Sequence, residues 1–315
     1  MFEIVFLGTS ASAPSIYRGL PSQAILAGEH RFLIDCGEGT QRQILKSGIG
    51  FKKLNRILLT HAHLDHILGL GGLVSTFVRW EDIEELEIYG GTAALNRVQT
   101  LLFDVVLANQ RTPIPIHLID LKAGEILSAR EFNVSTFPVQ HRGPGNFGFV
   151  FQEHTHHPFN VEKAIALGVP AGPERGRLVK GEAITLVDGR TVTPEMVLGE
   201  AIPGTKLVHI GDIGRLDESI AEQVKDAHAL VMESTFLEVE ADVAAAHGHI
   251  TAKQAAEFAR DNGVKTLILT HISRRYGERE VIAEARDIFP NTYVARDLDH
   301  YIIHRDRPVE KVEKS

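Results

Sequence analysis

Cysteine is nearly absent from this chain, which has one cysteine among 315 residues. A single thiol cannot form an internal disulfide or a thiolate-rich zinc site, and its isolation fits a reducing cytosol. No apolar run approaches the roughly 18 residues that span a membrane. The first eight residues also lack the basic segment of a signal peptide. We therefore expect a cytoplasmic protein that has no membrane partner.

The chain has fewer basic than acidic residues, and its formal net charge is −8. This excludes a protein coated in basic surface, but a local cationic groove on an acidic body could still bind nucleic acid. With 315 residues, of which 43% are hydrophobic, the chain can bury a sizeable core. Its length allows one large domain or two.

Short apolar runs that predict β-strands alternate with helical periodicities in both halves of the chain. An amphipathic helix is expected over 251–262, with Thr251 as its cap and Gly263 as its stop, and a second, glycine-weakened helix over 67–80. The segment from about 152 to 203 is rich in glycine and proline and predicts an extension with little core of its own. The predicted strands are 3–7, 23–26, 31–34, 56–60, 206–210, 229–232 and 266–270.

One motif follows the predicted strand 56–60 and carries four side chains that can bind metal. It has the pattern H-x-H-x-D-H, formed by His61, His63, Asp65 and His66. Imidazole nitrogen and carboxylate oxygen both suit Zn²⁺. Six residues cannot enclose an ion alone, so distant parts of the chain must supply the remaining ligands.

Three distant residues complete a candidate ligand set. His141 follows a strand-like run, Asp212 lies between glycines, and His271 follows a strand and a threonine, as His61 does. Two metal ions about 3.5–4 Å apart need a carboxylate that bridges them, and such a pair activates water near neutral pH. The seven candidates divide into His61, His63 and His141 for one ion, Asp65, His66 and His271 for the other, and Asp212 for both.

This ordered set resembles the metallo-β-lactamase superfamily and, within it, the ribonuclease Z family of tRNA 3′-processing endonucleases. The motifs that carry the resemblance are Phe6-Leu-Gly-Thr-Ser10, Ile34-Asp-Cys-Gly-Glu-Gly-Thr-Gln-Arg-Gln43, Leu59 to His66, Gly211-Asp212, Glu233-Ser-Thr-Phe236, Gly248-His249-Ile-Thr-Ala252 and Leu269 to Tyr276. The resemblance implies an α/β fold, an αββα sandwich of two mixed β-sheets flanked by helices. It also implies a single domain over 1–315 with an inserted, flexible tRNA-binding arm at 153–200.

The resemblance also implies roles for individual residues. Two zinc ions per subunit are expected, with Mn²⁺ or Mg²⁺ as substitutes. Asp65 would orient or deprotonate the attacking water, and His249, partnered by Glu233, would protonate the leaving oxygen. The expected partners are precursor tRNA and a second copy of the chain, as a homodimer. Candidate RNA contacts are Arg175, Arg177 and Lys180 in the arm and, because of its bidentate guanidinium, Arg275.

The implied activity is removal of the 3′ trailer from precursor tRNA, with a cut after the discriminator nucleotide. Two other functions stay open at this point. A small-molecule phosphodiesterase or arylsulfatase would share the same dinuclear core, and a metal-loaded nucleic-acid-binding module would need no chemistry. Plain structural roles also stay open, with His249 as a residue that caps a helix and the arm's basic residues as ordinary surface charges.

Overall fold

The structure is a computed structural model that describes residues 1–80, 83–108 and 110–313. The chain divides into two units, one formed by Met1–Gln152 with Thr205–Ser315 and the other by Glu153–Gly204. Within the described ranges, no helix has both the length and the apolar character needed to cross a membrane.

An eight-stranded mixed sheet forms one layer of the larger unit. Its strands from β3 to β6 run parallel, and the other neighbours pair antiparallel. In spatial order they are β17 (Glu310–Lys311), β16 (His300–Ile303), β1 (Phe2–Gly8), β2 (Ser22–Ala27), β3 (His30–Ile34), β4 (Arg56–Leu58), β5 (Leu86–Gly90) and β6 (Ile116–Asp120).

A seven-stranded mixed sheet forms the second layer. Its strands from β12 to β15 run parallel, and β9 pairs antiparallel with β12. In spatial order they are β15 (Thr292–Val294), β14 (Leu267–Thr270), β13 (Ala229–Glu233), β12 (Lys206–His209), β9 (Phe147–Glu153), β8 (Phe132–Pro138) and β7 (Gly124–Ser128).

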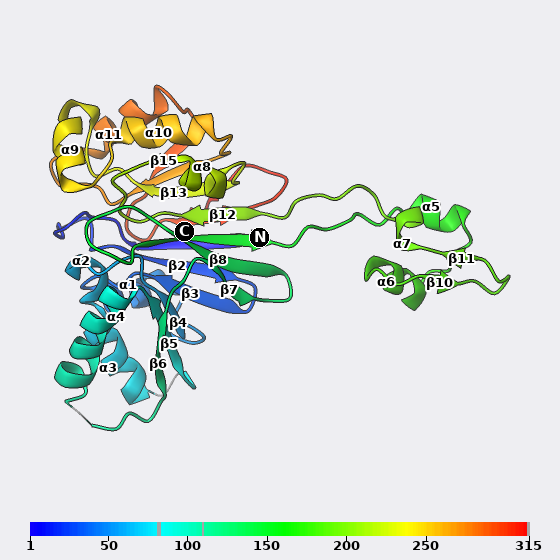
Figure 1. The fold of residues 1–315 in the computed structure, drawn as a ribbon, viewed down its shortest axis with the longest axis horizontal. Helices are drawn as coiled ribbons and strands as arrows, with labels where there is room; N and C mark the ends of the chain where they lie inside the picture. The colour runs from blue at the N-terminus through cyan, green and yellow to red at the C-terminus, as the bar shows by residue number, and fades with distance from the viewer. Residues whose placement is uncertain (81–82, 109, 314–315) are drawn as a thin grey trace. The chain divides into compact units, whose positions relative to one another are not determined.

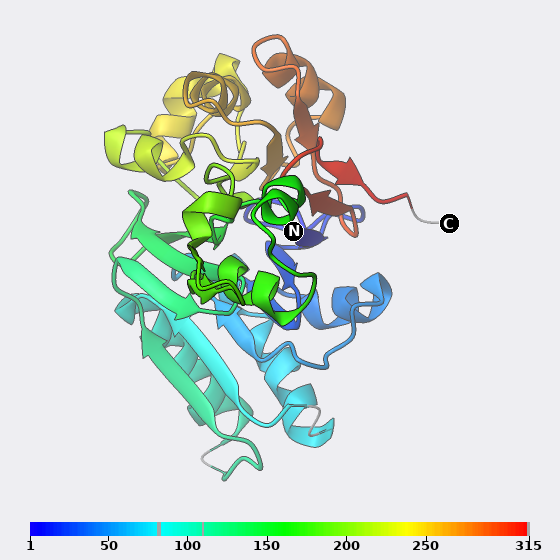
Figure 2. The ribbon, with the colours of Figure 1, turned by 90° about the vertical axis from the view of Figure 1, so that its right-hand side faces the viewer.

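Helices cover the outer face of each sheet (Figure 1). Beside the first sheet lie α1 (Thr40–Ser47), α2 (Leu64–Ile67), α3 (Leu70–Trp80), α4 (Thr92–Gln99) and the π-helix η1 (Thr100–Val106). Beside the second sheet lie α8 (Glu218–Val224), the 3₁₀-helix η2 (Glu238–Glu240), α9 (Ala241–His247), α10 (Ala252–Asp261) and α11 (Glu278–Arg286). Figure 2 shows α10 and α11 in yellow and orange along the outer side of that sheet. The αββα fold expected from the sequence is confirmed.

Aromatic side chains from both sheets fill the space between the two layers. Phe2 and Phe32 on the first sheet meet Phe151 on the second, with ring centroids 6.1 and 5.3 Å apart. Such edge-to-face pairs add to the free energy gained by burying apolar area. Two further apolar clusters lie between each sheet and its helices.

The helix predicted over 251–262 is confirmed as α10, and its start shows why it forms there. The Thr251 hydroxyl accepts a hydrogen bond from the Gln254 amide (3.1 Å), and the Gln254 side chain accepts one from the Thr251 amide (3.0 Å). This reciprocal cap satisfies two amides at the start of the helix. Gly263 follows the helix with a φ of 68°, a conformation that favours glycine.

The smaller unit has a fold of its own. It contains α5 (Val161–Ala166), α6 (Pro173–Val179), α7 (Pro194–Val197) and the hairpin of β10 (Ile184–Thr185) with β11 (Thr191–Val192). Its buried apolar side chains are Ala164, Val169, Leu178, Ile184, Val192 and Val197. The core is small, as the glycine-rich and proline-rich composition predicts. The unit includes the residues 153–200 for which the arm is predicted.

Candidate metal centre

The candidate ligands converge beyond the ends of strands that lie far apart in the sequence. His61 follows β4, and His141, Asp212 and His271 follow β8, β12 and β14. The remaining ligands belong to the same turn as His61 and to α2, which begins at Leu64. Active sites of α/β folds form at such strand ends.

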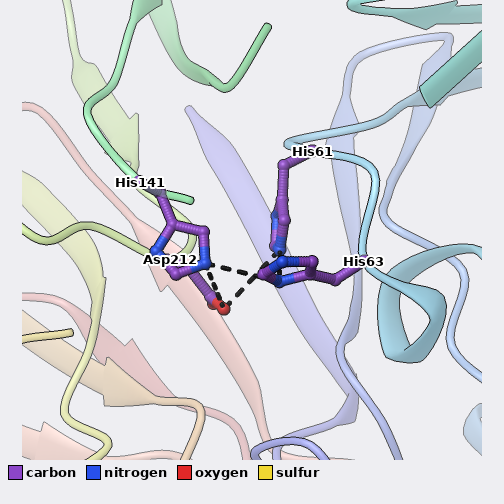
Figure 3. Close-up of side chains that lie close together, drawn as sticks. All are labelled: His61, His63, His141 and Asp212. Atoms are coloured by element: carbon purple, nitrogen blue, oxygen red, sulfur yellow. Dashed lines mark hydrogen bonds and ion pairs between the residues drawn. The ribbon is translucent and has the colours of Figure 1, made fainter. Parts of the chain in front are cut away.

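The structure brings together the two groups that the sequence predicts. In each group, the atoms able to bind metal lie within 4.8 Å of one another. Figure 3 shows the side chains of the first group turned toward a common point. The groups are His61, His63, His141 and Asp212, and Asp65, His66 and His271.

Asp212 lies between the two groups, and each of its oxygens faces one of them. Oδ2 lies 3.6 Å from His61 Nε2 and 3.7 Å from His141 Nε2. Oδ1 lies 3.6 Å from His66 Nε2 and 3.3 Å from His271 Nε2. Ligand atoms around a tetrahedral zinc ion, with bonds of about 2.1 Å, are about 3.4 Å apart. These separations therefore fit two ions that share one carboxylate.

Three buried polar atoms in the centre lack a hydrogen-bond partner among the described residues. They are His66 Nε2, His271 Nε2 and Asp212 Oδ1, and the two nitrogens lie 3.6 and 3.3 Å from that oxygen. Buried polar atoms are nearly always paired, and an unpaired cluster calls for an ion or other ligand. The donor set therefore fits a divalent metal.

The second ring nitrogen of four histidines is held by a protein oxygen. This contact sets the tautomer and turns the other nitrogen toward the centre. His61 Nδ1 lies 3.0 Å from Thr60 Oγ1, His66 Nδ1 2.7 Å from Asp35 Oδ2, His141 Nδ1 2.7 Å from the Gly248 carbonyl oxygen, and His271 Nδ1 2.8 Å from Thr235 Oγ1.

Asp35 supports both groups, although the sequence analysis gave it no role. Its carboxylate accepts hydrogen bonds from the Thr60 amide (2.8 Å), the Thr60 hydroxyl (2.7 Å) and His66 Nδ1 (2.7 Å). Because Thr60 also contacts His61, one carboxylate orients a histidine of each group. The position of Asp35 directly after β3 is the sequence signal that could have identified it.

The protonation states of His61 and Asp65 suit metal binding. Burial lowers the pKa of His66, but the charges of Asp35 and Asp212 outweigh it and raise that pKa to about 10, so His66 must lose a proton when it binds an ion. Burial and the neighbouring His66 hold the pKa of His61 well below its ordinary value, so the imidazole is neutral. Burial opposes ionisation of Asp65, but the imidazole of His271, 3.8 Å from its Oδ2, and the charge of His66 outweigh it and lower the pKa of Asp65. Asp65 is therefore a carboxylate. Its Oδ2 accepts a hydrogen bond from the Ser12 amide (3.1 Å), and the residue lines an open cavity.

Beside the two groups, the partly buried His249 pairs with the fully buried Glu233. His249 Nδ1 lies 2.9 and 3.0 Å from the two oxygens of Glu233, which also accepts a hydrogen bond from the Ile213 amide (2.7 Å). Burial lowers the pKa of His249, but the charge and hydrogen bond of Glu233 outweigh it and raise that pKa to about 9. His249 also lies near enough to Asp212 and His271 to bind metal. Its tie to Glu233 favours a proton donor instead.

The predicted RNA contacts differ in how free their charges are. Arg275 lines the cavity, but its guanidinium pairs with Glu240 at 2.8 Å. In the smaller unit, Arg175 donates to the Val169 carbonyl (3.2 Å), Arg177 pairs with Glu182 (2.9 Å), and Lys180 is exposed.

Two arginines that the sequence analysis did not single out also line the cavity, Arg142 and Arg274. Arg142 donates to the Ala246 carbonyl oxygen at 2.9 Å. Arg274 is exposed and has no ion pair or hydrogen bond with a described residue. Arg142 directly follows the candidate ligand His141, and Arg274 lies within the motif Leu269 to Tyr276, so their positions in the sequence could have identified them.

The fold and this site define a metal-dependent hydrolase of the metallo-β-lactamase superfamily. Residues 169–272 match the family model of a β-lactamase superfamily domain, and residues 2–159 match that of the anti-Pycsar protein Apyc1. The solved structure of the short form of human tRNase Z aligns with a TM-score of 0.67 and 24% identity, over 96% of this chain and 99% of that chain. That likeness establishes the shared fold.

Closer sequence relatives decide the family. The ribonuclease Z of Bradyrhizobium diazoefficiens is 47% identical over 303 residues, which are 96% of this chain and 100% of that protein. The ribonuclease Z of Archaeoglobus fulgidus is 40% identical over 301 residues, or 95% of this chain and 96% of that protein. These matches cover both halves of the chain, whereas the Apyc1 model ends at residue 159. The chain belongs to the ribonuclease Z family, as the motifs predict.

Proposed function

We propose that this chain is the endoribonuclease that removes the 3′ trailer from precursor tRNA. It cuts after the discriminator nucleotide and leaves a 3′-hydroxyl on the tRNA and a 5′-phosphate on the trailer. Family membership supports the substrate. The observation that carries the chemistry is Asp212 between two ligand groups, with His249 and Glu233 paired beside them.

We propose two zinc ions per subunit, with Mn²⁺ or Mg²⁺ as substitutes. One would be held by His61, His63 and His141, the other by Asp65, His66 and His271, with Asp212 shared. A donor set of five imidazoles and two carboxylates supports zinc. When bound, such a pair lowers the pKa of water to near 7 and neutralises charge on the phosphoryl oxygens.

The chain's own groups supply the remaining chemistry. Asp65, ionised and at the open side of the site, orients the attacking water and accepts its proton. His249 donates the proton held at its Nε2 to the 3′ oxygen that leaves, and Glu233 keeps the imidazole charged and oriented. Attack and departure lie in line across the phosphorus, so Asp65 and His249 act from opposite sides of the phosphoryl group.

A cleavage assay tests this function. Precursor tRNA incubated with the protein and Zn²⁺ or Mn²⁺ should give one cut, after the discriminator nucleotide. Asp65→Ala should stay folded but lose nearly all single-turnover activity. Metal-loaded protein that leaves precursor tRNA uncut would end the proposal, and near-wild-type rates for the variant would remove Asp65 from the chemistry.

The arm, residues 153–200, is proposed to grip tRNA away from the cut, with Lys180, Arg175 and Arg177 as phosphate contacts. Its separate small core supports an independent binding module. Deletion of 154–199 should abolish tRNA processing while turnover of a small phosphodiester survives. Equal loss of both activities would assign the segment a purely structural role. Survival of tRNA processing would show that the arm is not needed to bind tRNA.

We further propose a cytoplasmic homodimer in which the arm of one subunit presents tRNA to the site of the other. This rests on the family resemblance. Mixing the arm deletion with Asp65→Ala should restore processing, because one mixed site would then have both an intact arm and intact chemistry. An inactive mixture of subunits that do exchange would exclude this arrangement.

A further inference from the structure

A second groove adjoins the cavity of the metal centre. The two share Ser273 and Arg274, so the loop after β14 forms a wall common to both. The groove is hollowed into the surface on the far side of this loop. Its lining includes Ser15, Tyr17, Arg18, Arg274, Tyr276 and Arg296. The chemistry assigned above uses none of these residues.

The rim of this groove presents an aromatic ring to solvent on a loop that is held by internal hydrogen bonds. Tyr17 is 82% exposed, and the neighbouring Ile16 is 89% exposed. The Ser15 hydroxyl accepts hydrogen bonds from the amides of Tyr17 (3.2 Å) and Arg18 (3.0 Å). Large apolar surface exposed on an ordered loop costs free energy in water, which is a reason to seek a partner for it.

Arg18 anchors this loop to the body of the larger unit. Its guanidinium donates to the Thr9 hydroxyl (2.7 Å) and the Ala295 carbonyl (2.5 Å), and it pairs with Glu278 (3.2 Å). The Gly19 amide donates to Asp297 at 2.6 Å. These contacts fix the loop that carries Tyr17. A ligand that stacks on the Tyr17 ring therefore does not have to pay the entropy cost of ordering the loop.

The charges in the groove favour an anion beside that ring. Arg18, Arg274 and Arg296 face Glu278 and Asp297, which leaves one positive charge in excess. Arg296 is tied to Glu278 by contacts of 2.7 and 2.8 Å. Arg274 has no such partner within the described part of the chain, and its guanidinium is free to bind a phosphate.

The direction of the reaction indicates which strand passes here. The leaving 3′ oxygen belongs to the tRNA and must face His249, which lies beside Phe236 and Arg142 in the cavity. The tRNA body therefore approaches from that wall. The trailer begins on the other side of the scissile phosphate, toward Asp65 and Ser12, whose amide donates to the Asp65 carboxylate. The loop that carries Ser12 continues to Ser15 and Tyr17, which line the second groove.

We propose that this groove binds the first nucleotides of the single-stranded trailer, with Tyr17 stacked on a base and Arg274 on a phosphate. The inference rests on the proposed function and deepens it. Aromatic stacking combined with a cationic side chain is how proteins bind single strands without reading their sequence. The site would therefore respond to trailer length rather than to trailer sequence.

The test compares two precursors that share one tRNA body, with trailers of one nucleotide and of about ten nucleotides. Tyr17→Ala and Arg274→Gln should each raise KM for the long trailer about tenfold, within the range of base–aromatic stacking. Tyr17→Ala should change neither KM for the one-nucleotide trailer nor turnover of a small phosphodiester. Tyr17→Phe keeps the ring and should behave as wild type. Arg279→Gln is the matched control, since Arg279 is an exposed arginine that does not line the groove.

Each outcome is decisive. A KM increase confined to the long trailer, and rescued by Tyr17→Phe, supports trailer binding. Equal changes for both trailers in Tyr17→Ala would indicate a structural effect of that substitution and overturn the proposal, as would no change for either. Failure of the wild-type protein to cut either precursor would instead refute the proposed tRNA processing.

Discussion

Asp35→Asn should weaken both metal sites, although Asp35 is predicted to bind neither ion. The carboxylate is 1% exposed and accepts three hydrogen bonds, two from Thr60 and one from His66. Asparagine has nearly the same shape but only one acceptor oxygen. In either orientation of the amide, at least one donor then faces an NH₂ group. If the NH₂ group takes the Oδ2 position, His66 is released directly and His61 through Thr60. If it takes the Oδ1 position, the Thr60 amide loses its acceptor, and His66 and the Thr60 hydroxyl keep only a neutral, weaker one.

The expected size of the effect follows from these contacts. Loss of a partner that orients a histidine ligand costs about 10–100-fold in metal affinity, which is about 1.4–2.7 kcal/mol per ion. Thr60→Val separates the effect of Asp35 on His61, which passes through Thr60, from its direct effect on His66. It removes only the hydroxyl between Asp35 and His61, and it leaves the contact between Asp35 and His66 in place. We therefore expect Thr60→Val to weaken one ion and Asp35→Asn to weaken both.

Competition with a chromophoric chelator measures the two stepwise zinc constants, and elemental analysis measures the stoichiometry. Thermal unfolding of each metal-free variant serves as the control for folding. If folded Asp35→Asn retained two zinc ions with wild-type constants, the idea that this carboxylate positions both groups would be wrong. If Thr60→Val weakened both ions equally, the separation of the two effects would fail.

Three further predictions follow from buried groups. Glu233→Gln should lower the pKa of His249 from about 9 toward 6.5. The decline of the cleavage rate at high pH should then begin at a lower pH, because His249 loses its proton earlier. The pH profile for an aryl phosphodiester, whose leaving group needs no acid, should not change in this way. Bound cations lower the pKa of His249 in the wild-type protein and in the variant alike, so the test is the difference in pH profile between these two proteins. Burial lowers the pKa of His209 to about 4, so the unfolded chain binds an extra proton between that value and 6.5. Stability should therefore fall as pH falls through this window, by at most about 3 kcal/mol, and urea unfolding of His209→Gln should lack this part of the loss. Chelation should lower Tm and added zinc should restore it, because metal binds the folded state; a Tm indifferent to zinc in calorimetry would contradict the metal assignment.

Most secondary structure could be predicted from local pattern, and the exceptions have tertiary causes. The strand predicted over 56–60 ends at Leu58 as β4, because the Thr60 amide bonds the Asp35 carboxylate instead of a neighbouring strand. The helix predicted over 67–80 is divided between the end of α2 and the whole of α3. The division falls at Gly69, whose amide bonds the Cys36 carbonyl at 2.8 Å. A Cβ there would lie 2.0 Å from the Gly37 carbonyl oxygen, so only glycine permits this approach.

Which charged side chains near the site are unpaired could not be predicted from local sequence pattern. Arg275 was the predicted RNA contact, yet Glu240 pairs with it, whereas Arg274 beside it is unpaired among the described residues. The two arginines are neighbours in the chain and alike in chemistry. Which of them keeps a free guanidinium depends on a glutamate 35 residues away from Arg275.

The sequence by itself determined the family, the αββα fold and the identity of the seven candidate ligands. These follow from short motifs placed after strands, and a motif is readable without knowing its neighbours. The tertiary structure decided that Asp212 faces both groups, that Asp35 orients a histidine of each, and that Tyr17 and Arg274 share a groove. These features depend on side chains brought together from distant segments, and packing of the two sheets sets that proximity.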